Sequence, residues 1–238
     1  MLEKLLHEMK LYGALEIVPQ LNKIKNPKEY ARLLLKAEYD FKSNRSIQRK
    51  LNSANFPYVK EWTDLDYSLN PKIDFETVQK LLNGEFLNNH HNISLIGTQG
   101  TGKTHSLIAL GRSICRKNVS VKFFKASELV NELKEAKKNY ILSKVMKKIM
   151  KFEFIIIDEL GYIPFSDEGA RLLFDVFASK YEHGSIAVSS NLSFDKWTQI
   201  FGSVELTAAL IDRFTHKSHI CNYQGKSVRL MQSKLNKN

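Results

Sequence analysis

Gly97-Thr98-Gln99-Gly100-Thr101-Gly102-Lys103-Thr104 matches the phosphate-loop pattern G-x-x-x-x-G-K-[ST] at every position. Its flanks predict a strand before it (Ile93–Ile96) and a helix after it (Lys103–Arg116), as this loop requires. Glycines let backbone N–H groups turn inward around phosphate oxygens, and the helix N-terminus adds a positive dipole. We therefore predict that all eight residues bind a nucleoside triphosphate, with Lys103 at the β- and γ-phosphates and the Thr104 hydroxyl on Mg²⁺.

A second apolar strand (Phe152–Ile157) ends in two adjacent carboxylates, Asp158 and Glu159. Asp158 is predicted to hold Mg²⁺ through water, and Glu159 to orient or deprotonate the attacking water. The alternative is an acidic turn after a buried strand. The pair follows Lys103 by 55 residues with one predicted strand between them, and this placement favours a role in phosphoryl transfer.

The next predicted strand, Ser185–Ser189, is followed by Ser190 and Asn191. A polar residue at this strand end would sit beside the γ-phosphate, between the two earlier motifs, so we predict that Asn191 holds the lytic water. The alternative is that Asn191 caps a helix or forms an Asx-turn.

The rest of residues 92–238 alternates short apolar runs with helical stretches, which predicts an α/β fold. Continuous β-branched runs indicate a parallel sheet covered by helices on both faces. The predicted strands are Ile93–Ile96, Val119–Phe124, Phe152–Ile157, Ser185–Ser189 and His219–Tyr223. The predicted helices are Lys103–Arg116, Ser127–Lys138, Ile141–Met150, Asp167–Tyr181 and Glu205–Phe214.

The N-terminal part is predicted to be a small all-α domain, residues 1–60. One helix follows from the spacing of Leu2, Leu5, Leu6 and Met9, and a second begins after Asn26-Pro27. Residues 61–91 are predicted to be a linker and a lead-in helix, Phe75–Leu87, and the linker character begins at Asn52.

Composition points to an intracellular protein with a polyanionic partner. The chain has 238 residues, 36 Lys plus Arg against 25 Asp plus Glu, and a net charge of +11. Such a balance favours nucleic acid as partner, although a generic lysine-rich surface is the alternative. Two cysteines are too few for a disulfide framework, and no apolar run is long enough to span a bilayer. We expect a cytoplasmic location and no membrane contact.

Two basic clusters are the predicted DNA contacts. Clustered lysines displace counterions from a phosphate backbone, so these contacts would carry little sequence preference; the alternative is a solvated lysine face. The predicted residues are Lys42, Arg45, Arg49 and Lys50 in the N-terminal part, and Lys137, Lys138, Lys144, Lys147, Lys148 and Lys151 between the second and third strands.

Four segments together resemble the IstB-type helper ATPases of insertion sequences, AAA+ proteins close to the bacterial helicase loader DnaC. They are Gly97–Thr104, Ile155–Pro164, Ser190-Asn191-Leu192 and Ala209–Phe214, and the resemblance extends over nearly the whole chain. It implies an AAA+ fold with sheet order 5-1-4-3-2, and ATP bound between neighbouring subunits of an oligomer. It also implies assembly on DNA, which we expect to be duplex, and recruitment or activation of a cognate transposase.

The resemblance also assigns residue roles. It makes Asp158 and Glu159 the Walker B pair, Asn191 the first sensor, and Arg213 an arginine finger supplied to a neighbouring subunit's nucleotide. The alternative for Arg213 is a surface arginine paired with a nearby acid. Only 24 residues follow Phe214, so we expect the usual C-terminal helical lid to be reduced or absent, with Arg229 as a candidate second sensor.

Four functions follow as hypotheses. The first is a DNA-stimulated ATP hydrolase that acts as a transposition helper. The second is a DnaC-like loader of the replicative helicase, which would prefer single-stranded DNA. The third is a nucleotide-gated scaffold without turnover, which the two carboxylates disfavour. The fourth is a metabolic P-loop kinase, which the basic charge disfavours.

Overall fold

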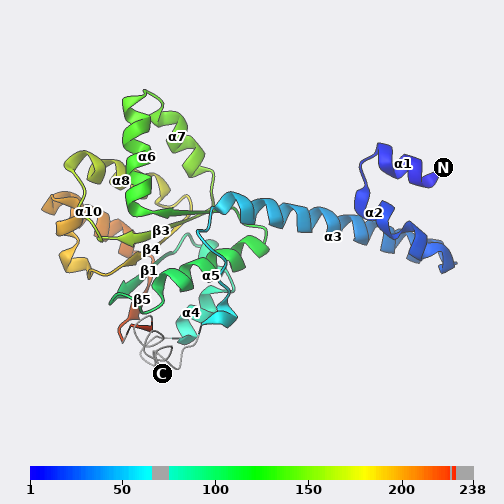
Figure 1. Cartoon of the computed structure of the whole chain (residues 1–238), viewed down its shortest axis with the longest axis horizontal. Helices are drawn as coiled ribbons and strands as arrows, with labels where there is room; N and C mark the ends of the chain where they lie inside the picture. Colours follow the sequence, from blue (N-terminus) through cyan, green and yellow to red (C-terminus); the bar gives the residue numbers. More distant parts are fainter. Residues whose placement is uncertain (66–74, 226, 229–238) are drawn as a thin grey trace, which may run out of the picture. The chain divides into compact units, whose positions relative to one another are not determined.

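The computed structural model describes residues 1–65, 75–225, 227 and 228. Within these residues five parallel strands form one sheet, in the order β2-β3-β4-β1-β5 (Figure 1). Read from the other edge this is the order 5-1-4-3-2, so the predicted fold is confirmed. The strands are β1 (Asn92–Gly97), β2 (Val121–Lys125), β3 (Phe154–Leu160), β4 (Ser185–Ser190) and β5 (Ser218–Tyr223).

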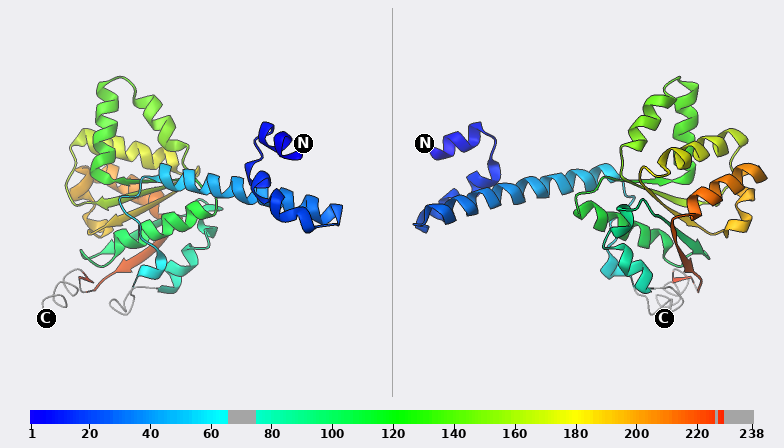
Figure 2. Two further views of the ribbon diagram at one scale, coloured as in Figure 1. Left: turned by 45° about the vertical axis from the view of Figure 1, so that its right-hand side comes forward. Right: turned by 180° about the vertical axis from the view of Figure 1, so that it is seen from behind.

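Helices cover both faces of this sheet (Figure 2). Alternate residues of β3 show the reason: Ile155 and Ile157 are buried in one core cluster, while Phe154 and Ile156 are buried in another. The helices that follow the lead-in region are α5 (Lys103–Arg116), α6 (Ala126–Lys138), α7 (Leu142–Met150), α8 (Asp167–Lys180), α9 (Thr198–Phe201) and α10 (Val204–Thr215), with a short 3-10 helix η5 (Phe194–Lys196).

Two predicted boundaries are wrong for identifiable reasons. Strand β3 includes Asp158 and Glu159 and ends at Leu160. Strand β2 pairs with it as far as Asp158, and β4 pairs with it again at Leu160, after an irregularity that follows Ile157. The predicted helix Phe75–Leu87 is interrupted by Gly84, whose left-handed φ of 76° ends the helical path. It divides into α4 (Phe75–Leu81) and the 3-10 helix η4 (Glu85–Leu87).

The segment expected to be a linker from Asn52 has a defined structure up to Leu65. The chain divides into two compact units, Met1–Lys50 and Leu51–Asn238. Helix α3 (Pro27–Ala54) contributes residues 27–50 to the first unit and 51–54 to the second. The rest of the predicted linker, 66–70, lies outside the described residues.

Glu61 attaches this segment to α5. Its carboxylate accepts hydrogen bonds from Arg112 Nε and Arg116 Nη1, each at 2.8 Å. The hydrogen bond from Arg116 is the main cause of the lowered pKa of Glu61. Glu61 also precedes the 3-10 helix η2 (Trp62–Asp64), and Trp62 packs against the core beneath α5. These contacts fix residues 61–65 against the helix that begins at the phosphate loop.

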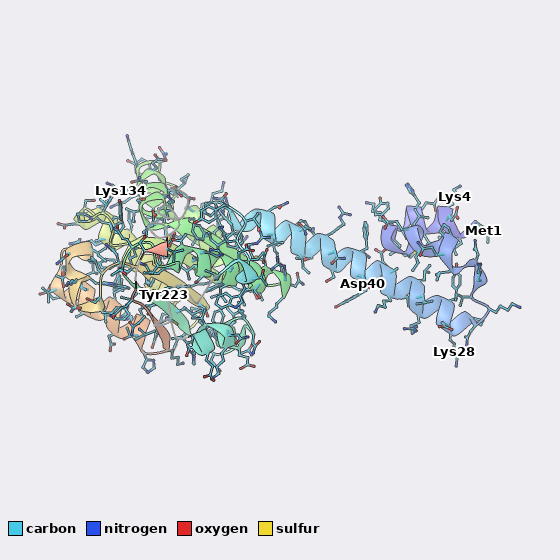
Figure 3. All side chains as sticks on the ribbon, turned by 60° about the horizontal axis from the view of Figure 1, so that its bottom comes forward. Met1, Lys4, Lys28, Asp40, Lys134 and Tyr223 are labelled. Carbon is cyan, nitrogen blue, oxygen red and sulfur yellow. The ribbon has the colours of Figure 1, made fainter. Side chains whose placement is uncertain are left out.

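The N-terminal unit contains α1 (Leu2–Glu8), α2 (Tyr12–Ile17), the 3-10 helix η1 (Val18–Lys23) and the first part of α3 (Figure 3). Its small core includes Leu6, Ala14 and Val18. Glu38 of α3 is buried, and its carboxylate accepts a hydrogen bond of 3.1 Å from the Ala14 N–H. A carboxylate at the first turn of α2 satisfies N–H groups that have no partner within the helix.

We predict that Glu38→Gln destabilises the N-terminal unit by about 1–3 kcal/mol, because a charge-assisted bond to a helix end is lost. Burial raises the pKa of Glu38, but the bonds from Ala14 and Lys42 outweigh it, so the pKa in the folded unit is lowered. A lowered folded pKa adds stability above the unfolded pKa, and this stability is lost as pH falls through the folded pKa.

Hydrogen exchange at the Ala14 amide, measured from pH 7 to pH 3, checks this prediction. We expect faster exchange in Glu38→Gln at pH 7, and a difference from wild type that shrinks below about pH 4. Asp40→Asn, at an exposed position of the same helix (Figure 3), is the matched control. Equal exchange at pH 7 in Glu38→Gln and wild type would show that this bond contributes nothing.

Candidate active site

The eight residues of the predicted phosphate loop lie together at the carboxyl end of β1, where α5 begins. The ammonium group of Lys103 donates to the carbonyls of Gly97 and Thr98, both at 2.7 Å. Thr101 Oγ1 donates to the same Thr98 carbonyl at 2.8 Å. The Lys103 ammonium group therefore lies beside the first two residues of its own loop, close to where the loop would hold phosphates.

Residues after β5 contact this loop, and these contacts were not predicted from the sequence. Thr98 Oγ1 donates to the Gly225 carbonyl at 3.1 Å, and the Val228 N–H donates to the Gly100 carbonyl at 2.9 Å. A Cβ on Gly100 would lie 2.1 Å from Ser227 Oγ, and φ at this glycine is 76°, so any other residue would be strained and would displace Ser227. Arg229, the candidate second sensor, lies outside the described residues.

Asp158 is the buried member of the carboxylate pair. It is 1% exposed, and its Oδ1 accepts hydrogen bonds from Thr104 Oγ1 at 3.1 Å and from Ser189 Oγ. Burial raises the pKa of Asp158, while these two hydroxyls oppose the rise. A carboxylate and a hydroxyl oxygen side by side are the donors that Mg²⁺ takes from a protein when nucleotide phosphates supply others. The residues present therefore fit a magnesium ion.

Glu159 faces a different environment. Its backbone has a left-handed φ of 59°, and its N–H donates to Ser189 Oγ at 3.0 Å. Its side chain is 48% exposed and forms an ion pair of 3.5 Å with Lys125, at the end of β2. The carboxylate of Asp158 is thus buried beside Thr104, whereas that of Glu159 is accessible at the carboxyl end of the strands.

Ser189 and Lys125 were not predicted as site residues. Ser189 lies on β4 and Lys125 on β2, the two strands on either side of β3. Both strands end in polar residues, which is the only sequence signal for either contact. The signal becomes specific once the strand order is known.

Asn191 directly follows β4 and is exposed. The preceding residue, Ser190, pairs with Ile96 of β1 and with Leu160 of β3. Asn191 therefore lies at the carboxyl end of the strands, the same end of the sheet as the phosphate loop and Glu159. The N-cap of the following helix η5 is Ser193, so Asn191 is not that cap.

Arg213 lies at the opposite end of the sheet. It lines a cavity of about 90 Å³ with Asn92, at the start of β1, and Gly184, just before β4. Its guanidinium lies 5.6 Å from the ring centre of Phe174, and among the described residues it makes no ion pair. From Asn92, which lines the same cavity, to Gly97 at the start of the phosphate loop, β1 spans roughly 17 Å at about 3.3 Å per residue. Arg213 cannot reach the nucleotide site of its own chain.

The second basic cluster occupies one face of α7. Lys144, Lys147, Lys148 and Lys151 are all exposed, while Val145 and Ile149 contact the core on the other face. Of the two α6 lysines in the cluster, Lys138 is exposed, but Lys137 forms an ion pair of 2.8 Å with Glu168 of α8. The charge of Lys137 is therefore partly neutralised within the protein.

The first basic cluster lies on α3 and makes local contacts. Lys42 forms an ion pair with Glu38 at 3.2 Å, and Arg45 lies 5.7 Å from the ring centre of Phe41. Arg49 Nε donates to the Arg45 carbonyl at 3.4 Å. Lys50 is the last residue of the N-terminal unit. DNA contact by these residues stays a prediction.

A family model described as IstB-like ATP binding protein matches residues 6–236. The chain belongs to the IstB-like family. This IstB-like protein is 36% identical over 207 residues to a putative ATP-binding protein of insertion sequence IS5376 from Geobacillus stearothermophilus, covering 87% of this chain and 82% of the relative. It is 32% identical to a putative ATP-binding protein of insertion sequence IS21 from Pseudomonas aeruginosa, covering 88% and 79%.

Solved structures agree on the fold of the IstB-like protein. The crystal structure of the DnaC helicase loader is similar with a TM-score of 0.52 and 19% identity, covering 75% of this chain and 99% of that one. The resemblance stated from the sequence motifs is thereby confirmed at the level of family and fold. Among the residues described, no helix combines the length and the apolar character that crossing a membrane demands.

Proposed function

We propose that this IstB-like protein is a magnesium-dependent ATPase that assembles on DNA and acts as a transposition helper for its insertion sequence. One observation carries the proposal. The phosphate loop and both carboxylates lie at one end of the sheet, and the exposed Arg213 lies at the other. A head-to-tail assembly would bring the arginine of one copy to the nucleotide of the next.

Within one chain, each residue has a separate task. Lys103 would exchange its bonds to the Gly97 and Thr98 carbonyls for phosphate oxygens. Thr104 and Asp158 would hold Mg²⁺, which neutralises charge on the phosphates. Glu159 would accept a proton from the attacking water, and Asn191 would orient that water. Arg213 from the neighbouring copy would stabilise the charge that develops on the transferred phosphoryl group.

The lysine face of α7 supports DNA as the partner. Three lysines lie on one face of α7 and Lys151 directly follows the helix; all four are exposed, and α7 carries no acidic residue. Such a face binds the phosphate backbone of DNA by releasing condensed counterions. The relatives from IS5376 and IS21 are named for their insertion sequences, which supports a cognate transposase as the protein partner.

ATP hydrolysis and DNA affinity, measured with duplex, single-stranded and no DNA across a salt series, test the proposal. We expect duplex DNA to stimulate hydrolysis. Lys144→Ala/Lys148→Ala should lower the slope of log affinity against log salt by about 1.8, because two phosphate contacts are lost at about 0.9 each. Hydrolysis without DNA should not change, since neither lysine contacts the site.

Lys117→Ala/Lys196→Ala removes two exposed lysines elsewhere on the same unit and serves as the matched control. An unchanged slope in the α7 variant would show that this face does not bind DNA. Hydrolysis stimulated by single-stranded DNA and not by duplex DNA would instead favour a helicase loader. Absence of hydrolysis under every condition would remove the ATPase proposal.

A further inference from the structure

The turn between α6 and α7 presents two apolar side chains to solvent. Tyr140 is 98% exposed and Ile141 is 47% exposed. Helices α6 and α7 form a hairpin whose turn points away from the sheet, and Figure 2 shows this from two sides. An aromatic ring at such a position buries no area and contributes nothing to the core.

Tyr140 also occupies a backbone conformation that disfavours it. Its φ is 59°, in the left-handed region. Helix α6 ends there with the Tyr140 N–H bonded to the Lys137 carbonyl at 3.1 Å and the Ile141 N–H bonded to the Ala136 carbonyl at 2.8 Å. Glycine is the favoured residue at the left-handed position of this helix end. Folding alone therefore does not explain a tyrosine here.

The surroundings of the turn are basic. Lys138 ends α6, and Lys144, Lys147 and Lys148 follow on the exposed face of α7. An exposed aromatic ring flanked by cations matches the two needs of a nucleic acid, which offers a phosphate backbone and the flat faces of its bases. A protein-docking surface would require a wider apolar area than these two side chains provide.

We propose that Tyr140, with Ile141 beside it, stacks on the face of a DNA base that no adjacent base covers. The inference rests on the proposed DNA binding and adds a specific contact to it. The base face could come from a duplex step opened by the apolar turn, or from a single strand. In both cases the lysines hold the backbone and the ring contacts the base, so the turn selects distorted or unpaired DNA over uniform duplex.

Equilibrium affinity of the full-length protein for three DNAs of one length tests this: a perfect duplex, a duplex with a central mismatched bubble, and a single strand. We expect Tyr140→Ala to lose roughly tenfold in affinity for the bubble or the single strand, in line with the loss of one stacked base. The perfect duplex should lose less. Tyr140→Phe should bind like wild type, because the ring and not the hydroxyl makes the contact.

Tyr140→Gly separates a binding role from a structural one. Glycine is favoured at this left-handed position, so the melting temperature of the Tyr140→Gly variant should equal or exceed that of wild type. Its affinity for DNA should fall as in Tyr140→Ala. The salt slope should not change, since no charge is removed. If the variants lose affinity for the bubble alone, the stacked base belongs to an opened duplex step. If they lose affinity for the single strand alone, the stacked base belongs to unpaired DNA.

Equal affinities of Tyr140→Ala and wild type for all three DNAs would overturn the inference. So would a Tyr140→Phe variant as weak as Tyr140→Ala, because the ring would then be irrelevant. If wild type binds none of the three DNAs, the proposed function itself fails. That result is distinct from wild type and Tyr140→Ala binding equally well.

Discussion

Glu159→Gln is expected to bind ATP as tightly as wild type and to hydrolyse it at least about 100-fold more slowly. The glutamine keeps the size of the side chain but cannot accept a proton from water. Nucleotide affinity should persist, because the contacts of Lys103, Thr104 and Asp158 do not involve the Glu159 side chain. Assemblies on DNA should consequently last longer, since ATP remains intact.

Single-turnover hydrolysis and ATP titration on the same preparation check this expectation. Glu16→Gln is a control, because Glu16 is also an exposed glutamate but lies on α2 of the N-terminal unit and lines neither the phosphate loop nor the Arg213 cavity. It should hydrolyse ATP normally. Normal turnover in Glu159→Gln would show that the general base has been assigned to the wrong residue.

The ion pair with Lys125 bears on how Glu159 acts. At 3.5 Å and with both side chains about half exposed, the pair is weak and readily exchanged for water. Glu159 can therefore leave Lys125 when an attacking water must be bound. Asp158 has no such freedom, because it is buried between two hydroxyls. The two carboxylates can divide the work of metal binding and proton transfer because β3 turns them into these different environments.

The phosphate loop and the α/β fold could be predicted because their signals are local in the chain. The loop, its strand and its helix are consecutive, and the burial of β3 on both faces is written in Phe154–Ile157. Ser189 and Lys125 could not be predicted in this way. Their contacts to Asp158 and Glu159 require β2 and β4 on either side of β3. The family resemblance implies that order, but the order alone does not say which polar residue at each strand end meets a carboxylate.

The contacts of the segment before β1 could not be predicted for the same physical reason. Asn52 to Leu65 has the composition of a linker, yet Glu61 is held by Arg112 and Arg116, which are 51 and 55 residues away. Three charged side chains that look solvated in the sequence meet where η2 contacts α5, beside Trp62, which packs against the core. Likewise, nothing in the sequence of Gly225 and Val228 indicates that they bond to the phosphate loop.

Arg213→Ala is expected to reduce hydrolysis about 10³-fold or more while leaving the folded chain and its ATP affinity intact. The side chain is exposed, its guanidinium lies over the Phe174 ring, and it makes no ion pair within the described residues, so its removal leaves no buried charge without a partner. The large effect is expected because a guanidinium supplied in trans compensates the charge of the transition state. Arg171→Ala, at an exposed arginine of α8, is the matched control and should remain active.

Mixing two inactive variants shows whether the arginine acts on a neighbour. Lys103→Ala should lose nucleotide binding but still carries Arg213, whereas Arg213→Ala still carries an intact phosphate loop. In a head-to-tail assembly, a Lys103→Ala copy can supply its arginine to an Arg213→Ala copy, so the mixture should recover a substantial fraction of wild-type turnover. A mixture as inactive as its components would mean that Arg213 acts within its own chain or not at all. The length of β1 between the Arg213 cavity and the phosphate loop of the same chain, roughly 17 Å, then leaves only the second possibility.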